Sequence, residues 1–220
     1  MLDKRLNAIF NQIGECNVLA DIGTDHGLLC LTALKMDKAK KVIATDISDK
    51  SIQKAINLLT ENGFENNCEF RVGDGLSVLS SSEADVIVVS GMGGREICKM
   101  INSAHEFSSR FILSPQSDVK LVRQTLLSCG FEIISDFVVL SQSKFYDIIV
   151  AQKGESAYTE FELEYGKISH RAKSEDYILW LDKEIEKATN LSRQTNGEVK
   201  EMFVKREQEL LSIKSEIYGG

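Results

Sequence analysis

Short runs of β-branched and other apolar residues recur through the first two thirds of the chain, with helical periodicity between them. Runs this continuous are typical of strands that are covered on both faces of a sheet. Strands that alternate with helices predict right-handed βαβ units and an open, doubly wound α/β sheet. The five predicted strands of this kind are residues 18–23, 41–46, 68–74, 85–91 and 110–114.

Two of the intervening helices have recognisable ends. Ser48 is a suitable N-cap for a helix that Asn62-Gly63 would end. Ser117 is expected to open a second helix, which Gly130 would close.

The last two predicted strands, residues 131–140 and 145–152, are joined by only four residues. So short a link requires an antiparallel hairpin. Five helix-linked strands and a terminal antiparallel pair give the seven-stranded sheet expected of a Rossmann-like methyltransferase. The sixth strand of a dehydrogenase's dinucleotide domain would more often be parallel. This fold analogy favours the methyltransferases over the dehydrogenases, but a shared fold does not establish a function.

The remainder of the chain is rich in Glu and Lys and has no glycine-punctuated strands. Apolar residues from Ile178 to Ala188 follow a 3-4-3 spacing, and a similar seam continues after Asn196-Gly197. This pattern predicts two amphipathic helices that form an antiparallel, coiled-coil-like helical hairpin. We therefore divide the chain into a sheet domain, residues 1–153, and a helical hairpin domain, residues 154–220.

Composition narrows the class of protein. No apolar stretch approaches the roughly 20 residues that span a membrane, and residues 1–6 show no apolar signal segment. We therefore expect a cytoplasmic protein without a membrane partner. Five scattered cysteines without a Cys-x-x-Cys pair predict neither a metal centre nor a disulfide framework. The net charge of −7 disfavours a general nucleic-acid binder but permits a local basic face.

A glycine turn follows the first predicted strand, in the segment Asp21-Ile22-Gly23-Thr24-Asp25-His26-Gly27. Glycine lets the backbone approach a ligand closely, and the next helix start offers free N–H groups. Asp25 stands where a Gly-x-Gly-x-x-Gly dinucleotide motif has its middle glycine. A carboxylate there would repel a pyrophosphate but tolerates the positive sulfonium and amino groups of S-adenosylmethionine. The segment therefore favours S-adenosylmethionine over NAD.

Three further strand ends carry potential cofactor contacts. Asp46 lies about 20 residues after the glycine turn, where a carboxylate suits a ribose diol. Each feature alone could be an ordinary turn or helix cap, but all of them fall at the carboxyl edge of one sheet, where ligands bind in such folds. The predicted cofactor-binding residues are Asp21, Ile22, Gly23, Thr24, His26, Asp46, Ile47, Asp74, Gly75, Gly91, Met92 and Gly93, and no metal ligand is predicted.

These segments resemble the bacterial tRNA adenine-22-N1 methyltransferase family, whose members are class I S-adenosylmethionine-dependent enzymes. The chain departs from the family at Asp46, where Glu is frequent, and at Ser117, where Asn often follows the Gln-Pro segment. The similar segments are Lys4-Arg5-Leu6 and residues 20–26, 73–76, 91–94 and 145–151.

The resemblance implies methyl transfer to N1 of an adenine in the D-arm region of tRNA. Adenine N1 has an in-plane lone pair, so alignment matters more than a base. Ser90-Gly91-Met92-Gly93 also lacks the Asn-Pro-Pro-Tyr or Asp-Pro-Pro-Tyr pattern of enzymes that methylate exocyclic amines. The product is cationic, and a nearby carboxylate would stabilise it. Asp25 is our prediction for this catalytic group, although it could equally hold only the amino end of the cofactor.

Contacts with tRNA are predicted at the same edge. Arg95, Lys144 and Tyr146 lie there, and Lys4 and Arg5 join them if the first helix folds over the site. Tyr146 could stack on a base or simply pack in the core. The basic cluster Lys38, Lys40 and Lys41 is predicted to be a solvated surface at the opposite edge, and Lys167, Arg171 and Lys173 are the nearest tail residues that could bind phosphate.

Other functions stay open at this point. The chain could methylate another RNA, a protein or a small molecule, or it could be a non-catalytic RNA-binding or scaffold protein. An NAD-dependent dehydrogenase is a further alternative. The expected partner is tRNA, and the expected state is a monomer or a weak dimer.

Overall fold

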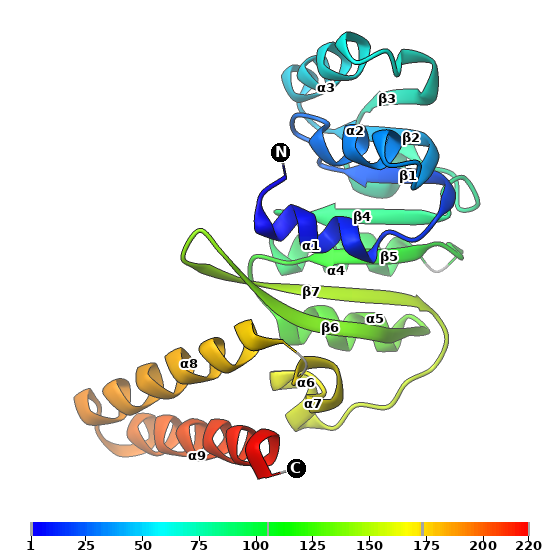
Figure 1. The fold of residues 1–220 in the computed structure, drawn as a ribbon. Coiled ribbons are helices and arrows are strands. Elements are labelled where there is room, and N and C mark those ends of the chain that lie inside the picture. The colour runs from blue at the N-terminus through cyan, green and yellow to red at the C-terminus, as the bar shows by residue number, and fades with distance from the viewer. Residues whose placement is uncertain (1, 105, 173, 220) are drawn as a thin grey trace.

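The computed structural model describes residues 2–104, 106–172 and 174–219, and within them the strands form one seven-stranded sheet (Figure 1). The strand order is β3-β2-β1-β4-β5-β7-β6. Neighbours are parallel except at β7, which runs antiparallel to both β5 and β6. The predicted Rossmann-like α/β fold with a terminal antiparallel pair is confirmed. The strands are β1 (Cys16–Ile22), β2 (Ala39–Asp46), β3 (Cys68–Val72), β4 (Val86–Ser90), β5 (Arg110–Ser114), β6 (Phe131–Ser141) and β7 (Lys144–Lys153).

Helices cover both faces of the sheet, and each face has its own apolar core. Phe10 of α1 and Leu59 of α3 contribute to one core, together with α2. Ile97 of α4 and Leu126 of α5 contribute to the core on the other face. The helices of this part are α1 (Lys4–Gln12), α2 (Leu28–Lys35), α3 (Asp49–Glu61), α4 (Gly94–Ser103) and α5 (Val119–Ser128), with short 3-10 helices η1 (Glu65–Asn67) and η2 (Gly75–Val78).

The predicted ends of α3 are confirmed, but the start of α5 differs. Ser48 is the N-cap of α3, and its hydroxyl accepts a hydrogen bond from the Ser51 backbone N–H at 3.4 Å. The N-cap of α5 is Asp118, in the left-handed conformation, and not Ser117. The Ser117 hydroxyl instead accepts a bond from the Gly94 N–H at 3.3 Å. The residue that the sequence assigns to α5 therefore fixes the loop before α5 to the start of α4.

A two-residue turn joins β6 to β7 and projects beyond the neighbouring strands (Figure 1). Gln142 and Ser143 both have positive φ angles, 49° and 66°. This is the backbone pattern of a type I′ turn, which matches the twist of the paired strands. Ser141 and Lys144, which the sequence places in the link, pair with each other as the last step of the ladder.

The C-terminal segment contains the predicted helical hairpin, formed by α8 (Glu175–Gln194) and α9 (Gly197–Gly219). Two short helices that the sequence analysis missed, α6 (Glu160–Tyr165) and α7 (Ile168–Arg171), precede it. The hairpin packs against the sheet through a third apolar cluster, in which Val138 of β6 meets Tyr177 and Leu210. The domain boundary at residue 153 stays a prediction.

A buried ion cluster also ties the tail to the sheet. Asp136 of β6 is fully buried, and its carboxylate accepts hydrogen bonds from Arg123 Nε at 2.8 Å and Arg171 Nη2 at 2.9 Å. Arg171 also pairs with Asp147 of β7. Arg171 was a potential phosphate contact in the sequence, but it is only 1 % exposed and is therefore no surface residue. Lys173 lies outside the described residues.

The basic cluster at the opposite edge of the sheet is less solvated than predicted. Lys38 donates hydrogen bonds to the backbone carbonyls of Phe10 and Ile13, at 2.9 and 2.6 Å, and so closes the end of α1. Lys41 pairs with Glu69. Lys40 donates a hydrogen bond to Asn17 Oδ1 at 2.9 Å, so all three lysines have partners within the protein.

Candidate functional site

A cavity of about 760 Å³ opens at the carboxyl edge of the sheet, and we call it the edge cavity. A volume of this size suits a cofactor or other small molecule. Seven of the predicted cofactor-binding residues line it, namely Ile22, Gly23, Asp46, Ile47, Asp74, Gly75 and Met92. Asp21, Thr24, His26, Gly91 and Gly93 lie outside its lining, as does Asp25.

Asp46 has its carboxylate fixed at the cavity wall by two backbone N–H groups. Ser48 donates to Oδ1 at 2.8 Å, and Asp25 donates to Oδ2 at 3.3 Å. The neighbouring Thr45 hydroxyl is buried at the cavity and has no hydrogen-bond partner in the described structure. A fixed carboxylate beside an unsatisfied hydroxyl is suited to a ligand that carries hydroxyl groups of its own.

Glycine is needed at two places in the cavity wall. Gly23 has a φ of +76°, and a Cβ there would lie 2.6 Å from Met92 Cε. Gly75 has a φ of +56°, and a Cβ there would lie 3.0 Å from Met100 Cγ and Sδ. Both conformations disfavour other residues. Bare backbone at these positions keeps the cavity open.

Asp21 stabilises the glycine turn from inside the protein. Its buried carboxylate accepts a hydrogen bond from the Thr24 hydroxyl at 2.8 Å, and the Cys30 thiol lies 3.7 Å away. Burial raises the pKa of Asp21 from 3.8 to about 6, against the opposing effect of the hydrogen bonds from Thr24 and Cys30.

Replacement of Asp21 by Asn should therefore make the protein more stable at alkaline pH. The carboxyl group binds its proton more tightly in the folded chain, so its stabilising contribution is complete below pH 3.8 and is lost as pH rises through 6. Asn keeps an acceptor for Thr24, and we expect a gain of up to about 3 kcal/mol at pH 8 that vanishes towards pH 4. Urea denaturation at pH 4.5, 6 and 8 measures it, with the exposed Asp37→Asn as control. Equal pH dependence in both variants would contradict this assignment.

Asp25, the predicted catalytic residue, points away from the edge cavity. Its carboxylate lies 2.7 Å from His26 Nδ1 and 4.0 Å from Lys54 Nζ of α3. The side chain is 66 % exposed, and the backbone is in the left-handed region with a φ of 51°. The structure thus places Asp25 and His26 on the rim of the turn, on the side of α3.

A smaller cavity of about 230 Å³ lies between the loop after β5 and the first residues of β7, and we call it the hairpin pocket. Two predicted RNA contacts, Lys144 and Tyr146, line it, together with Pro115, Gln116, Val119, Phe145 and Asp147. The Arg5 guanidinium lies over the Tyr146 ring at 5.0 Å, so α1 does fold over this edge.

Gly91 lines neither cavity but lies between lining residues of the two. A Cβ built there would lie 3.7 Å from Gln116 Nε2 and 3.8 Å from Arg5 Nη1. The Gln116 backbone N–H donates to the Met92 carbonyl at 2.9 Å. Met92 lines the edge cavity and Gln116 lines the hairpin pocket, so this backbone hydrogen bond links the walls of the two cavities.

Comparison with known proteins identifies the family. A family model described as a methyltransferase domain matches residues 2–149. The chain is 31% identical over 172 residues to the tRNA (adenine(22)-N(1))-methyltransferase of Bacillus subtilis strain 168, which covers 76% of this chain and 72% of that protein. The chain belongs to the tRNA (adenine(22)-N(1))-methyltransferase family.

The similarity to solved structures covers the C-terminal tail of this family member as well as its sheet. A Streptococcus pneumoniae protein, itself proposed to be a tRNA (m1A22) methyltransferase, aligns with a TM-score of 0.88 at 23% identity, over 97% of this chain and 99% of its own. M. capricolum TrmK, solved with the cofactor product S-adenosyl-homocysteine, aligns with a TM-score of 0.84 at 24% identity, over 99% of this chain and 98% of its own.

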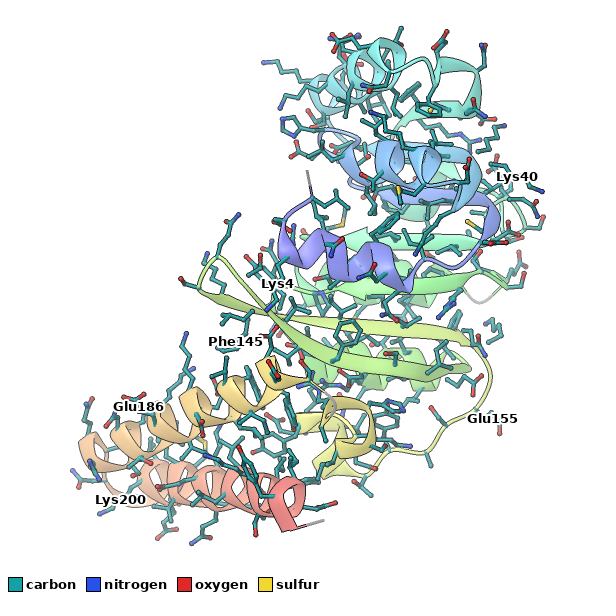
Figure 2. The ribbon with its side chains drawn as sticks, in the orientation of Figure 1. Lys4, Lys40, Phe145, Glu155, Glu186 and Lys200 are labelled. Carbon is teal, nitrogen blue, oxygen red and sulfur yellow. The ribbon has the colours of Figure 1, made fainter. Side chains whose placement is uncertain are left out.

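Lys4 and Arg95, the other predicted RNA contacts of this methyltransferase family member, lie apart from the hairpin pocket. Lys4, the first residue of α1, pairs with Asp176 of α8 at 2.8 Å (Figure 2). Arg95, at the start of α4, is 80 % exposed and 3.8 Å from Asp118. Among the predicted RNA contacts, the structure therefore brings together Arg5, Lys144 and Tyr146.

Several residues of the edge cavity were missed in the sequence of this methyltransferase. Glu96, Met100 and Ser103 come from α4, the helix that the Gly91-Met92-Gly93 turn opens. Their positions four and three residues apart place them on one helix face, and this spacing was the signal that could have found them. Lys99, three residues after Glu96 and four before Ser103, shares this spacing, whereas Phe107 lies beyond the end of α4 and carries no such signal.

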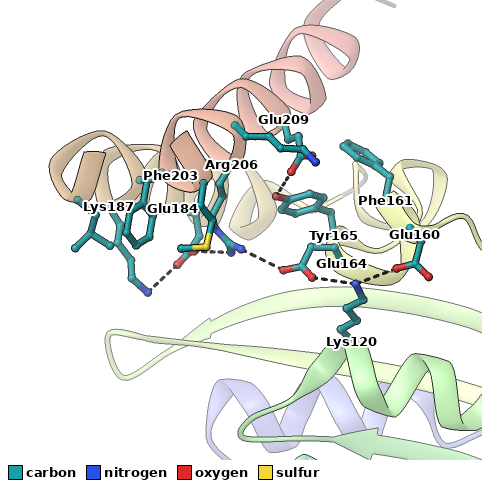
Figure 3. Close-up of a pocket in the computed structure, with 14 residues that line it drawn as sticks. Lys120, Glu160, Phe161, Glu164, Tyr165, Glu184, Lys187, Phe203, Arg206 and Glu209 are labelled. Atoms are coloured by element: carbon teal, nitrogen blue, oxygen red, sulfur yellow. Dashed lines mark hydrogen bonds and ion pairs between the residues drawn. The ribbon is translucent and has the colours of Figure 1, made fainter. Parts of the chain in front are cut away.

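A cavity of about 800 Å³ between α5, α6, α8 and α9 contains none of the predicted site residues (Figure 3). Its charged groups are paired with one another: Arg206 contacts Glu164 and Glu184, both at 3.1 Å. The Tyr165 hydroxyl donates to Glu209 at 2.7 Å. The pairing of these charged groups therefore favours the edge cavity as the candidate site, although the cavity at the tail is slightly larger.

In the described ranges of this family member, no group of three or more His, Cys, Asp or Glu side chains could hold a metal ion. No helix in those ranges is long and apolar enough to cross a bilayer. The five cysteines carry free thiols.

Proposed function

We propose that this protein transfers a methyl group from S-adenosylmethionine to N1 of adenine 22 in tRNA. The observation that carries the proposal is the hydrogen bond between Gln116 of the hairpin pocket and Met92 of the edge cavity, which makes the two cavities neighbours. A methyl donor in the edge cavity and a nucleobase in the hairpin pocket would bring their reacting atoms together. The membership of the chain in the tRNA (adenine(22)-N(1))-methyltransferase family supports the same reaction.

The edge cavity fits S-adenosylmethionine. Asp46 would accept hydrogen bonds from the two ribose hydroxyls, and the unpartnered Thr45 hydroxyl offers a further polar contact. Asp74 and Gly75 would hold the adenine end. When bound, the cofactor supplies an electrophilic methyl group on a positively charged sulfur.

The charge of the cavity favours this cofactor over NAD. Asp46, Asp74 and Glu96 line it, and Lys99 is the one cation among the described lining residues. Three carboxylates against one lysine attract a sulfonium with an amino group and repel a pyrophosphate. Asp25, for which this repulsion was predicted, lies outside the lining, so the repulsion would come from the three lining carboxylates instead.

The hairpin pocket would receive the target base, extruded from the folded tRNA. Adenine N1 attacks through its own lone pair, so the protein has to align the base rather than remove a proton. Tyr146, backed by the Arg5 guanidinium, offers an aromatic face for stacking. Lys144 is placed for a backbone phosphate. Asp25 stays our proposal for a carboxylate near the developing charge, although this requires its side chain to turn from Lys54.

The proposal includes the partner and the compartment. The partner is tRNA, and an enzyme that acts on tRNA in a bacterium would work in the cytoplasm. A monomer or weak dimer stays a prediction.

Incubation with methyl-labelled S-adenosylmethionine and an unmodified tRNA transcript tests the reaction. We expect one methyl group per tRNA, recovered as 1-methyladenosine, and a primer-extension stop at nucleotide 22. A transcript with guanine at position 22 should stay unlabelled. Label at another nucleotide would indicate a different methyltransferase, whereas absence of cofactor binding in calorimetry would indicate a scaffold.

A further inference from the structure

Asp147 is a carboxylate in the hairpin pocket that the proposed reaction has not yet used. It follows Tyr146 in β7 and lines the pocket, with 20 % of its side chain exposed. One oxygen, Oδ1, pairs with Arg171 Nη2 and lies 3.6 Å from Arg123 Nη2. No described residue donates a hydrogen bond to Oδ2. One oxygen is thus held by the protein, and the other is free to accept a bond from a ligand.

The orientation of Asp147 is fixed by buried groups. Arg171 is 1 % exposed, is shared with Asp136, and lies 5.4 Å from the ring of Tyr177 and 5.6 Å from that of Trp180. An acceptor held in this way loses little freedom when a ligand arrives. It can therefore discriminate between ligands more sharply than a mobile surface carboxylate.

The Watson–Crick edge of adenine presents two groups side by side. N1 accepts the methyl group, and the adjacent 6-amino group is a hydrogen-bond donor. An ionised carboxylate can only accept, so it would pair with the amino group of adenine and repel the O6 acceptor of guanine. We propose that Asp147 Oδ2 accepts a hydrogen bond from the 6-amino group of the target adenine and selects adenine over guanine. This inference rests on the proposed function.

The tRNA itself provides the first test, since position 22 can carry purine riboside, which keeps N1 but lacks the amino group. We expect the unaltered enzyme to methylate the purine-22 tRNA with kcat/KM lower by at least roughly 10- to 100-fold than the adenine-22 tRNA, because a hydrogen bond to a charged group is lost and N1 of purine is the weaker nucleophile. Equal rates on the two substrates would overturn the proposal without any variant. No methylation of adenine 22 at all would instead mean that the proposed function fails.

Asp147→Asn provides the second test. Arg171 needs an acceptor, so the Asn carbonyl should take its place and turn the side-chain NH₂ towards the pocket. The pocket would then present a donor to the 6-amino group, so the preference should fall to the part that the weaker nucleophilicity of N1 in purine sets. Asp25→Asn is expected to lower both rates by the same factor, because it does not touch the amino group.

Controls separate base reading from general damage. Asp182→Asn makes the same change on the exposed surface of α8, where Asp182 pairs with Lys214 of α9, and it should keep the full preference. The affinity of Asp147→Asn for S-adenosylmethionine, measured by calorimetry, should match the unaltered enzyme. An Asp147→Asn enzyme that binds cofactor and still prefers adenine by the full factor would contradict the role of this residue.

Discussion

Asp46→Ala should weaken S-adenosylmethionine binding by roughly 100-fold or more. The proposed ribose contacts are two hydrogen bonds to an ionised acceptor, each worth about 1.5–3 kcal/mol, and every 1.4 kcal/mol changes affinity tenfold. Calorimetric titration of the purified protein with the cofactor measures the change in Kd. Asp46→Asn, which keeps the size of the side chain, should lose less affinity because it retains one acceptor.

Asp49→Ala is the matched control for this result. Asp49 is the first residue of α3, is exposed, and lies outside the lining of the edge cavity. Its Kd should stay within about twofold of the unaltered protein, since surface substitutions away from a site have small effects. If Asp46→Ala bound the cofactor normally and Asp49→Ala did not, the cofactor would have to lie elsewhere along the edge.

Asp136→Asn should lower the free energy of unfolding by about 3–5 kcal/mol. The substitution keeps the shape of the side chain but leaves Arg123 and Arg171 buried with only the partly exposed Asp147 as counter-charge, and a broken buried ion pair has this cost. Urea denaturation at pH 7 measures it. Glu132→Gln, on the same strand and half-buried, should change stability by less than about 0.5 kcal/mol.

Asp136→Asn should also change how the free energy of unfolding falls at acid pH. Burial alone would raise the pKa of Asp136, but the charges of Arg171 and Arg123 outweigh it and lower the pKa below its ordinary value of 3.8. The contribution is therefore present above pH 3.8 and is lost as pH falls through the lowered pKa. The difference between wild type and Asp136→Asn should shrink in that range. A constant difference down to pH 3 would contradict the ionised state of Asp136.

Much of the fold follows from local pattern. The seven strands were placed within about two residues of their ends, because continuous β-branched runs and short links leave few alternatives. The helical hairpin followed from periodicity. The short helices α6 and α7 were missed because they are defined by contacts rather than by a repeated apolar stripe. Arg171 shows this best, since a buried arginine is visible only once Asp136 and Asp147 are brought beside it.

The sequence indicated where most residues of the candidate site lie along the sheet edge, but not which way their side chains point. Gly23, Asp46 and Met92 follow predicted strands and do line the edge cavity, because the carboxyl ends of parallel strands lie at one edge of the sheet. Sequence spacing could not show that Asp25 turns towards Lys54 of α3. The sequence could not indicate a role for Asp147 either, because that role depends on a pocket formed with the loop after β5.

The ion cluster also changes how the tail can be tested. Deletion of residues 154–220 would remove Arg171 from Asp136 and uncover Val138, which packs under the tail. Loss of activity would then reflect instability as much as lost tRNA contact. Single charge reversals on the exposed faces of α8 and α9 are the cleaner experiment.

The two-residue turn at Gln142-Ser143 fixes which side chains of β7 point to each face of the sheet. Tyr146 and Asp147 are neighbours on a strand, so they leave opposite sides of the sheet, one towards Arg5 of α1 and the other towards Arg171 of α7. One extra residue at the tip, if the two-residue turn were kept, would shift β7 by one position and exchange the two sides. The aromatic ring would then face the buried guanidiniums, and the carboxylate would face the N-terminal helix. Two loop residues that touch no ligand thus decide which chemistry each wall of the pocket presents.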